Sequence, residues 1–126
     1  MSARKHLLRL LPALLWLGVM LTLSSVSLKG LALEGLDKLA HMAEYLVLSV
    51  LVVAGLHQGG VRRLFLRVLA AVPIMALVAA ADELHQVWIP GRGADVLDFA
   101  ADAAGIVLGA GLVLAIVWWR GRGGDG

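Results

Sequence analysis

The hydrophobic positions of this chain gather into four long runs, separated by short polar segments. The runs cover roughly residues 7–28, 39–56, 64–81 and 99–119. About 20 mainly apolar residues in a helix are enough to cross the hydrocarbon core of a bilayer. The pattern therefore predicts an all-α, polytopic membrane protein. Its single domain, residues 1–126, would be a bundle of four transmembrane helices.

Composition supports the membrane assignment. The chain is 60% hydrophobic and 16% charged, with a mean hydropathy of +0.89. A soluble domain of 126 residues leaves too much of its surface in water to hide so many apolar side chains. The absence of cysteine excludes a disulfide framework, a thiol nucleophile and a cysteine-based metal site. The basic residues are divided among short membrane-flanking segments, so we expect no nucleic-acid partner.

Basic and acidic residues sort to opposite ends of the predicted helices. Eight of the eleven Lys and Arg residues lie at the two termini and in the second connection: Arg4, Lys5, Arg9, Arg62, Arg63, Arg67, Arg120 and Arg122. Because positive loops stay in the cytoplasm, both termini are predicted to be cytoplasmic. All acidic residues except Asp125 then lie on the extracytoplasmic side. The first run also resembles a signal peptide, but it is long enough to span the membrane, and we expect it to be retained.

A group of polar residues falls near the outer ends of the second, third and fourth predicted helices. Helical periodicity places Lys38, His41 and Tyr45 on one face of the second helix. On the fourth helix it aligns Asp98 and Asp102 in one stripe.

Gly105 and Gly109 continue that stripe. Glycines at this spacing let a neighbouring helix approach closely, so we expect the stripe to face the bundle interior. Glu83 and Gln86 come from the end of the third helix. Ionisable side chains at membrane depth are costly and by default indicate a functional site.

The order and spacing of these polar residues are specific. The chain contains Asp37-Lys38-x-x-His41-x-x-x-Tyr45, then Asp82-Glu83-x-x-Gln86, then Pro90-Gly91-Arg92 with Asp98 six residues on and Gly105 and Gly109 beyond. This pattern, over about residues 37–109, resembles the VanZ-like family. Members are small bacterial membrane proteins, named for one that lowers susceptibility to the glycopeptide antibiotic teicoplanin. Where this chain has Asp102, the family often carries Asn, so the site here gains a negative charge.

The resemblance implies a multi-pass protein of the bacterial cytoplasmic membrane with a role in the cell envelope or in glycopeptide resistance. One hypothesis is a binding protein that sequesters or excludes a glycopeptide or an envelope precursor. A second is a membrane-embedded enzyme acting on a lipid or lipid-linked envelope precursor. In the enzyme, His41 would be the general acid/base, and Glu83 or Asp98 would orient it or act as the base. Lys38 and Arg92 would hold a phosphate or carboxylate.

A third hypothesis is a small ion-coupled transporter, with Asp102, Glu83 and His41 as a proton relay. The apolar cytoplasmic half of each helix makes this the weakest of the three. Whether the protein is an enzyme stays open at this point.

The candidate site residues fall into three groups. The candidate catalytic residues are His41, Glu83 and Asp98. The candidate ligand-binding residues are Lys38, Tyr45, Gln86, Arg92 and Asp102. A divalent cation, if bound, would be held by His41, Glu83, Asp98 and Asp102, although no compact motif such as HExxH is present. Membrane lipids are expected partners, together with a lipid-linked envelope precursor or a glycopeptide. The oligomeric state stays open.

Overall fold

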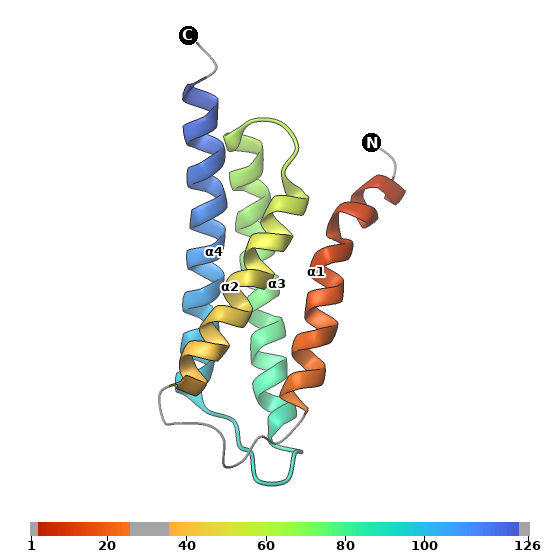
Figure 1. The fold of residues 1–126 in the computed structure, drawn as a ribbon, viewed down its shortest axis with the longest axis vertical. Helices are drawn as coiled ribbons and strands as arrows, with labels where there is room; N and C mark the ends of the chain where they lie inside the picture. The colour runs from red at the N-terminus through yellow and green to blue at the C-terminus, as the bar shows by residue number, and fades with distance from the viewer. Residues whose placement is uncertain (1–2, 26–35, 124–126) are drawn as a thin grey trace.

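The computed structural model describes residues 3–25 and 36–123, and in these residues the chain is helical, without strands. The helices are α1 (Ala3–Ser24), α2 (Leu36–Leu56), α3 (Val61–Gln86) and α4 (Val96–Arg122), as Figure 1 shows. All four are long and apolar enough to cross a membrane. The predicted class, an all-α polytopic membrane protein, is confirmed.

The helices extend beyond the apolar runs that predicted them. α3 continues to Gln86 and α4 begins at Val96, whereas the apolar runs suggested limits near residues 81 and 99. Backbone hydrogen bonding continues a helix through polar residues, so hydropathy alone underestimates its length. As a result the acidic residues near these ends project from regular helix. α1 ends at Ser24, and residues 26–28 of its predicted range lie outside the described residues.

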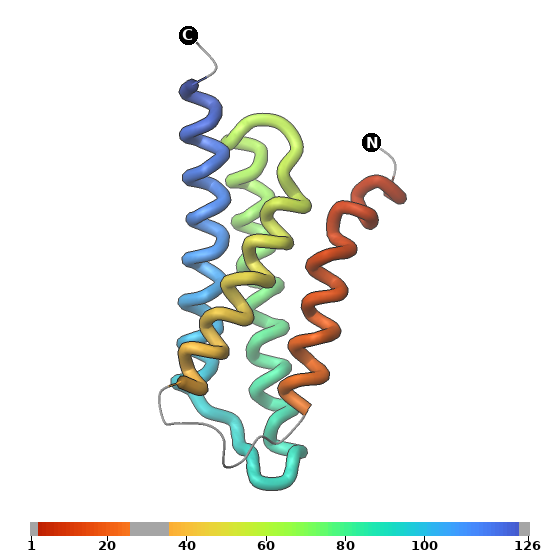
Figure 2. The backbone as a smooth tube through the Cα atoms, viewed as in Figure 1, coloured from red at the N-terminus to blue at the C-terminus, as the bar shows by residue number. Residues whose placement is uncertain are grey.

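The helices alternate in direction, so α1 begins and α4 ends at the same end of the bundle (Figure 1). We call this the basic end. The opposite end, where α1 and α3 finish and α2 and α4 start, is called the polar end. α2 packs against α4 and α1, and α3 packs against α4 (Figure 2).

Close packing of α2 on α4 depends on small residues. A Cβ atom at Gly105 would collide with the backbone carbonyl oxygen of Met42, and one at Gly109 would lie 2.6 Å from the carbonyl oxygen of Leu46. Between them, the hydroxyl of Ser49 donates a hydrogen bond of 2.7 Å to the carbonyl of Ile106. The prediction that the glycine stripe faces a neighbouring helix is confirmed. That neighbour is α2 of the same chain.

The outer surface is apolar along the helices. Large side chains such as Leu15, Leu77 and Val107 are more than half exposed, as expected for positions that face lipid. At the basic end, Arg67 donates to the carbonyl of Leu56 at 2.7 Å. That carbonyl is at the C-terminus of α2, where helical acceptors lack intrahelical partners.

Candidate functional site

The polar end holds a buried cluster of ionisable side chains from three helices. His41 lies in the second turn of α2, and Glu83 lies in the last turn of α3. Asp98 and Asp102 occupy the first two turns of α4. Each of these four residues is at most 6% exposed. The structure therefore brings together all three candidate catalytic residues and the fourth candidate cation ligand.

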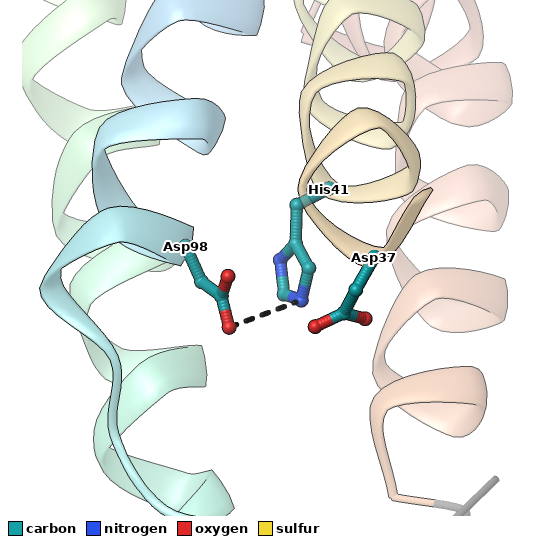
Figure 3. Close-up of side chains that lie close together, drawn as sticks. All are labelled: Asp37, His41 and Asp98. Atoms are coloured by element: carbon teal, nitrogen blue, oxygen red, sulfur yellow. Dashed lines mark ion pairs between the residues drawn. The ribbon is translucent and has the colours of Figure 1, made fainter. Parts of the chain in front are cut away.

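His41 is the centre of this cluster. Its Nδ1 atom lies 3.0 Å from Oδ1 of Asp102 and 3.8 Å from Oε1 of Glu83. Its Nε2 atom lies 4.0 Å from Oδ2 of Asp98, the pair that Figure 3 marks with a dashed line. Figure 3 also shows the carboxylate of Asp37 on the other side of the ring. The two ring nitrogens thus face different carboxylates.

Glu83 is fixed by hydrogen bonds from its own neighbourhood. The backbone N–H of Asp95 donates to Oε2 at 3.1 Å, and the side-chain amide of Gln86 donates to Oε1 at 3.4 Å. Gln86 is three residues after Glu83, one helical turn away. Gln86 therefore holds a carboxylate that faces His41.

Lys38 connects α2 to the start of α4. Its ammonium lies 3.0 Å from Asp98 and 3.2 Å from Asp95. Asp95 is also the N-cap of α4, because its Oδ1 accepts a 2.8 Å hydrogen bond from the backbone N–H of Leu97. That hydrogen bond, followed by the contact with Lys38, holds the pKa of the Asp95 carboxyl below its usual value. The ion pair between Lys38 and Asp95 was not predicted from the sequence.

Comparison with known proteins adds an independent line of evidence. The family model described as VanZ/LLP1 matches residues 3–118, nearly the whole chain. The chain belongs to the VanZ/LLP1 family. No curated protein and no solved structure matches it. The predicted family resemblance is confirmed, and the four candidate spans agree with a VanZ-like multi-pass membrane protein.

In this VanZ/LLP1 protein, the candidate ligand-binding residue Arg92 forms a hydrogen bond with the end of α1. Its guanidinium donates to the backbone carbonyl of Ser24 at 3.0 Å. The hydroxyl of Ser24 in turn donates to Oδ1 of Asp82 at 2.7 Å, and both side chains are buried. Arg92 and Asp82 therefore attach α1 to the polar end. The sequence signal for Ser24 was weak, a small polar residue near the end of an apolar run.

Two buried oxygens at the polar end have no hydrogen-bond partner within the described residues. They are the hydroxyl of Tyr45 and Oδ2 of Asp102, and both residues are 0% exposed. Tyr45 is one turn beyond His41 on α2, on the face that the periodicity predicted. Buried polar atoms without partners are rare in proteins. The cluster can therefore accept one more hydrogen-bonding or coordinating group.

Proposed function

We propose that this protein acts at the bacterial cytoplasmic membrane, with its polar end facing outward. There the site around His41 binds a cell-envelope precursor or a glycopeptide and so lowers susceptibility to teicoplanin. The observation that carries the proposal is the burial of His41 between carboxylates of α3 and α4 at one end of a VanZ/LLP1 bundle. Ionisable groups placed this way are costly to keep in a membrane protein, and functional sites are where they are retained.

The charge distribution supports the outward orientation. The basic end carries Arg9 and Arg67, and the C-terminal turn of α4 carries Arg120 and Arg122. Cytoplasmic membrane-flanking segments are enriched in Lys and Arg. With the basic end inside, the cluster around His41 faces the cell envelope.

The composition of the cluster supports binding of a ligand rich in donors. Carboxylates outnumber cations around His41, because Lys38 is already paired with Asp98 and Asp95. Ammonium or amide N–H groups of an incoming ligand would satisfy the spare carboxylate oxygens. An apolar partner would leave these oxygens without hydrogen bonds.

The test is protection of a susceptible bacterium that expresses the protein. The minimal inhibitory concentration of teicoplanin should rise with the wild type and return toward the empty-vector value with His41→Ala. His85→Ala is the matched control, because His85 lies on an exposed face at the same end of α3. Membrane levels of all variants are measured by immunoblot. Equal protection by wild type and His41→Ala would refute the proposal.

A second candidate function, envelope-precursor chemistry, is favoured by one specific contact. Asp102 lies within hydrogen-bonding distance of Nδ1 of His41. With a proton on Nδ1, Asp102 orients the ring and leaves Nε2 as a base, an arrangement used in general acid–base catalysis. Lys38 contacts Asp98 of this site, whereas Arg92 donates to the backbone carbonyl of Ser24, so Lys38 is the better placed cation for a phosphate or carboxylate.

Binding and catalysis are separated by measuring affinity and function together. For an enzyme, His41→Ala and Glu83→Gln abolish function while part of the ligand affinity remains. For a binding protein, affinity and function fall in step. The transporter hypothesis ranks below both. A transport path would need polar groups deeper in the bundle, but the hydroxyl of Ser49, a polar residue deeper in α2, is used in helix packing, where it donates to the carbonyl of Ile106.

A further inference from the structure

We propose that His41, Glu83 and Asp102 bind a divalent transition-metal ion, with Nδ1 of His41 and one oxygen of each carboxylate as ligands. The metal site goes beyond the envelope role described above. It is a property of the purified protein, and it stands or falls separately from teicoplanin protection.

The three ligand atoms are already grouped as an ion would require. All of them lie within 4.8 Å of one another. Nδ1 of His41 is 3.0 Å from Asp102 and 3.8 Å from Glu83. Ligands held at about 2.0–2.2 Å from one Zn²⁺ ion are separated from each other by roughly 3–3.6 Å. Small rotations of the side chains are enough to complete the site.

Charge balance also points to a cation. Glu83 and Asp102 are buried carboxylates, and His41 is the one basic side chain within 4 Å of either in the described part of the chain. Lys38 is occupied by Asp98 and Asp95 on the outer side of the cluster. Buried charges without compensation are strongly unfavourable. A divalent ion with a neutral imidazole would neutralise both carboxylates.

An independent observation is the second oxygen of Asp102. It is fully buried and lacks a hydrogen-bond partner among the described residues, although it belongs to a carboxylate of the triad. The hydroxyl of Tyr45, one helical turn beyond His41, is another buried oxygen without a hydrogen-bond partner in the described part of the chain. A bound ion and its water would supply the missing partners.

A second group, Asp37, His41 and Asp98, has similar spacing and is drawn in Figure 3. Its Asp98 already holds the ammonium of Lys38 at 3.0 Å, and that positive charge opposes a second cation. Among residues 3–25 and 36–123, no Lys or Arg side chain lies at hydrogen-bonding distance from Glu83 or Asp102 of the inner triad. We therefore assign the ion to the inner group of His41, Glu83 and Asp102.

The ligand set selects the kind of metal. One imidazole nitrogen with two carboxylate oxygens suits Zn²⁺ or Mn²⁺ better than Mg²⁺, which prefers oxygen ligands and retains its waters. Three protein ligands leave a coordination position open, as catalytic zinc sites do. An open position would let the ion contact a ligand at the polar end.

The experiment uses the full chain, purified in detergent and stripped with a chelator. After equilibration with Zn²⁺ and gel filtration, elemental analysis should find one Zn²⁺ per chain, and calorimetry gives the affinity. Asp102→Asn and Glu83→Gln should each weaken binding by at least about tenfold. Asp37→Asn and His85→Ala should bind as the wild type does. Circular dichroism checks that each variant keeps its helix content.

The wild type alone can overturn the proposal, whatever the variants do. Failure to retain Zn²⁺ or Mn²⁺, or equal affinity for Mg²⁺, would exclude this metal site. Loss of binding in Asp37→Asn with retention in Asp102→Asn would place the ion in the outer group instead and reject the assignment. If metal binding fails while His41→Ala still abolishes protection, the envelope role survives. If metal binds and protection is unaffected by His41→Ala, the metal site survives alone.

Discussion

Gly105 of α4 lies directly against the backbone carbonyl of Met42 in α2, with no room for a Cβ atom. Asp102 is three residues before Gly105, and His41 is the residue before Met42. The close approach of the two helices therefore sets the 3.0 Å separation between Nδ1 of His41 and Asp102. Helix packing and site geometry depend on the same contact.

Gly105→Ala should destabilise the bundle. The added methyl group meets backbone atoms of α2, which cannot move aside as a flexible side chain can. Overpacking of this kind costs about 1–3 kcal/mol. Thermal unfolding in detergent measures the loss.

Gly111→Ala is the matched control, because no atom lies within 4 Å of a Cβ built at Gly111. Alanine is the better helix former, so this variant should be as stable as the wild type or slightly more so. Equal stability of the Gly105 and Gly111 variants would show that α2 and α4 do not rely on the close contact.

The sequence predicted those parts of the structure that depend on one helix at a time. Helix number, the inward face of α2 and the glycine stripe of α4 follow from hydropathy and from a period of 3.6 residues. Convergence of His41, Glu83 and Asp102 also follows, because all three are placed at the same end by alternating helix direction.

Pairing between helices could not be predicted in the same way. Whether Arg92 reaches Asp98 or the carbonyl of Ser24 depends on the path of the connection between α3 and α4, which no periodicity encodes. Partnership of Ser24 with Asp82 depends on the rotation of α1 against α3. Many apolar residues of α1 are themselves exposed, so its sequence indicates only weakly which face packs against the other helices.

Ser24→Ala should weaken the attachment of α1. The change removes the 2.7 Å hydrogen bond to Asp82 and leaves a buried carboxylate oxygen without its donor. Unsatisfied buried groups cost about 1–3 kcal/mol. Urea or thermal unfolding of the purified protein reports the difference.

Ser25→Ala provides the comparison for this prediction. Ser25 is exposed, and its hydroxyl donates a 2.7 Å hydrogen bond to the carbonyl of Leu21 in α1, the helix that ends one residue before it. Its loss should change the free energy of unfolding much less. A larger effect at Ser25 than at Ser24 would contradict the role assigned to the Asp82 contact.

Lys38 should interact more strongly with Asp98 than with Asp95. Both distances are short, but the Asp98 side chain is 8% exposed and that of Asp95 is 43% exposed. Solvent screens an exposed ion pair more effectively than a buried one.

Two double-mutant cycles measure this difference. One combines Lys38→Gln with Asp98→Asn, and the other combines Lys38→Gln with Asp95→Asn. The coupling energy in the first cycle should exceed that in the second, and added salt should reduce the second more. Equal coupling energies in both cycles would mean that burial of Asp98 does not strengthen its ion pair.

Acid should weaken the start of α4 through Asp95. The hydrogen bond from Leu97 and the contact with Lys38 lower the pKa of this carboxyl below its ordinary value of 3.8. A group with a depressed folded pKa stabilises the protein above its unfolded pKa, and that contribution is lost as pH falls through the folded pKa.

Asp95→Asn keeps a side-chain oxygen for the cap but removes the titrating charge. The melting temperature of the wild type should therefore exceed that of Asp95→Asn by a constant amount between about pH 7 and pH 5. The difference should then shrink as the pH drops below 3.8. A difference that grows on acidification would have the opposite sign and would show that the ionised carboxyl does not stabilise this helix start.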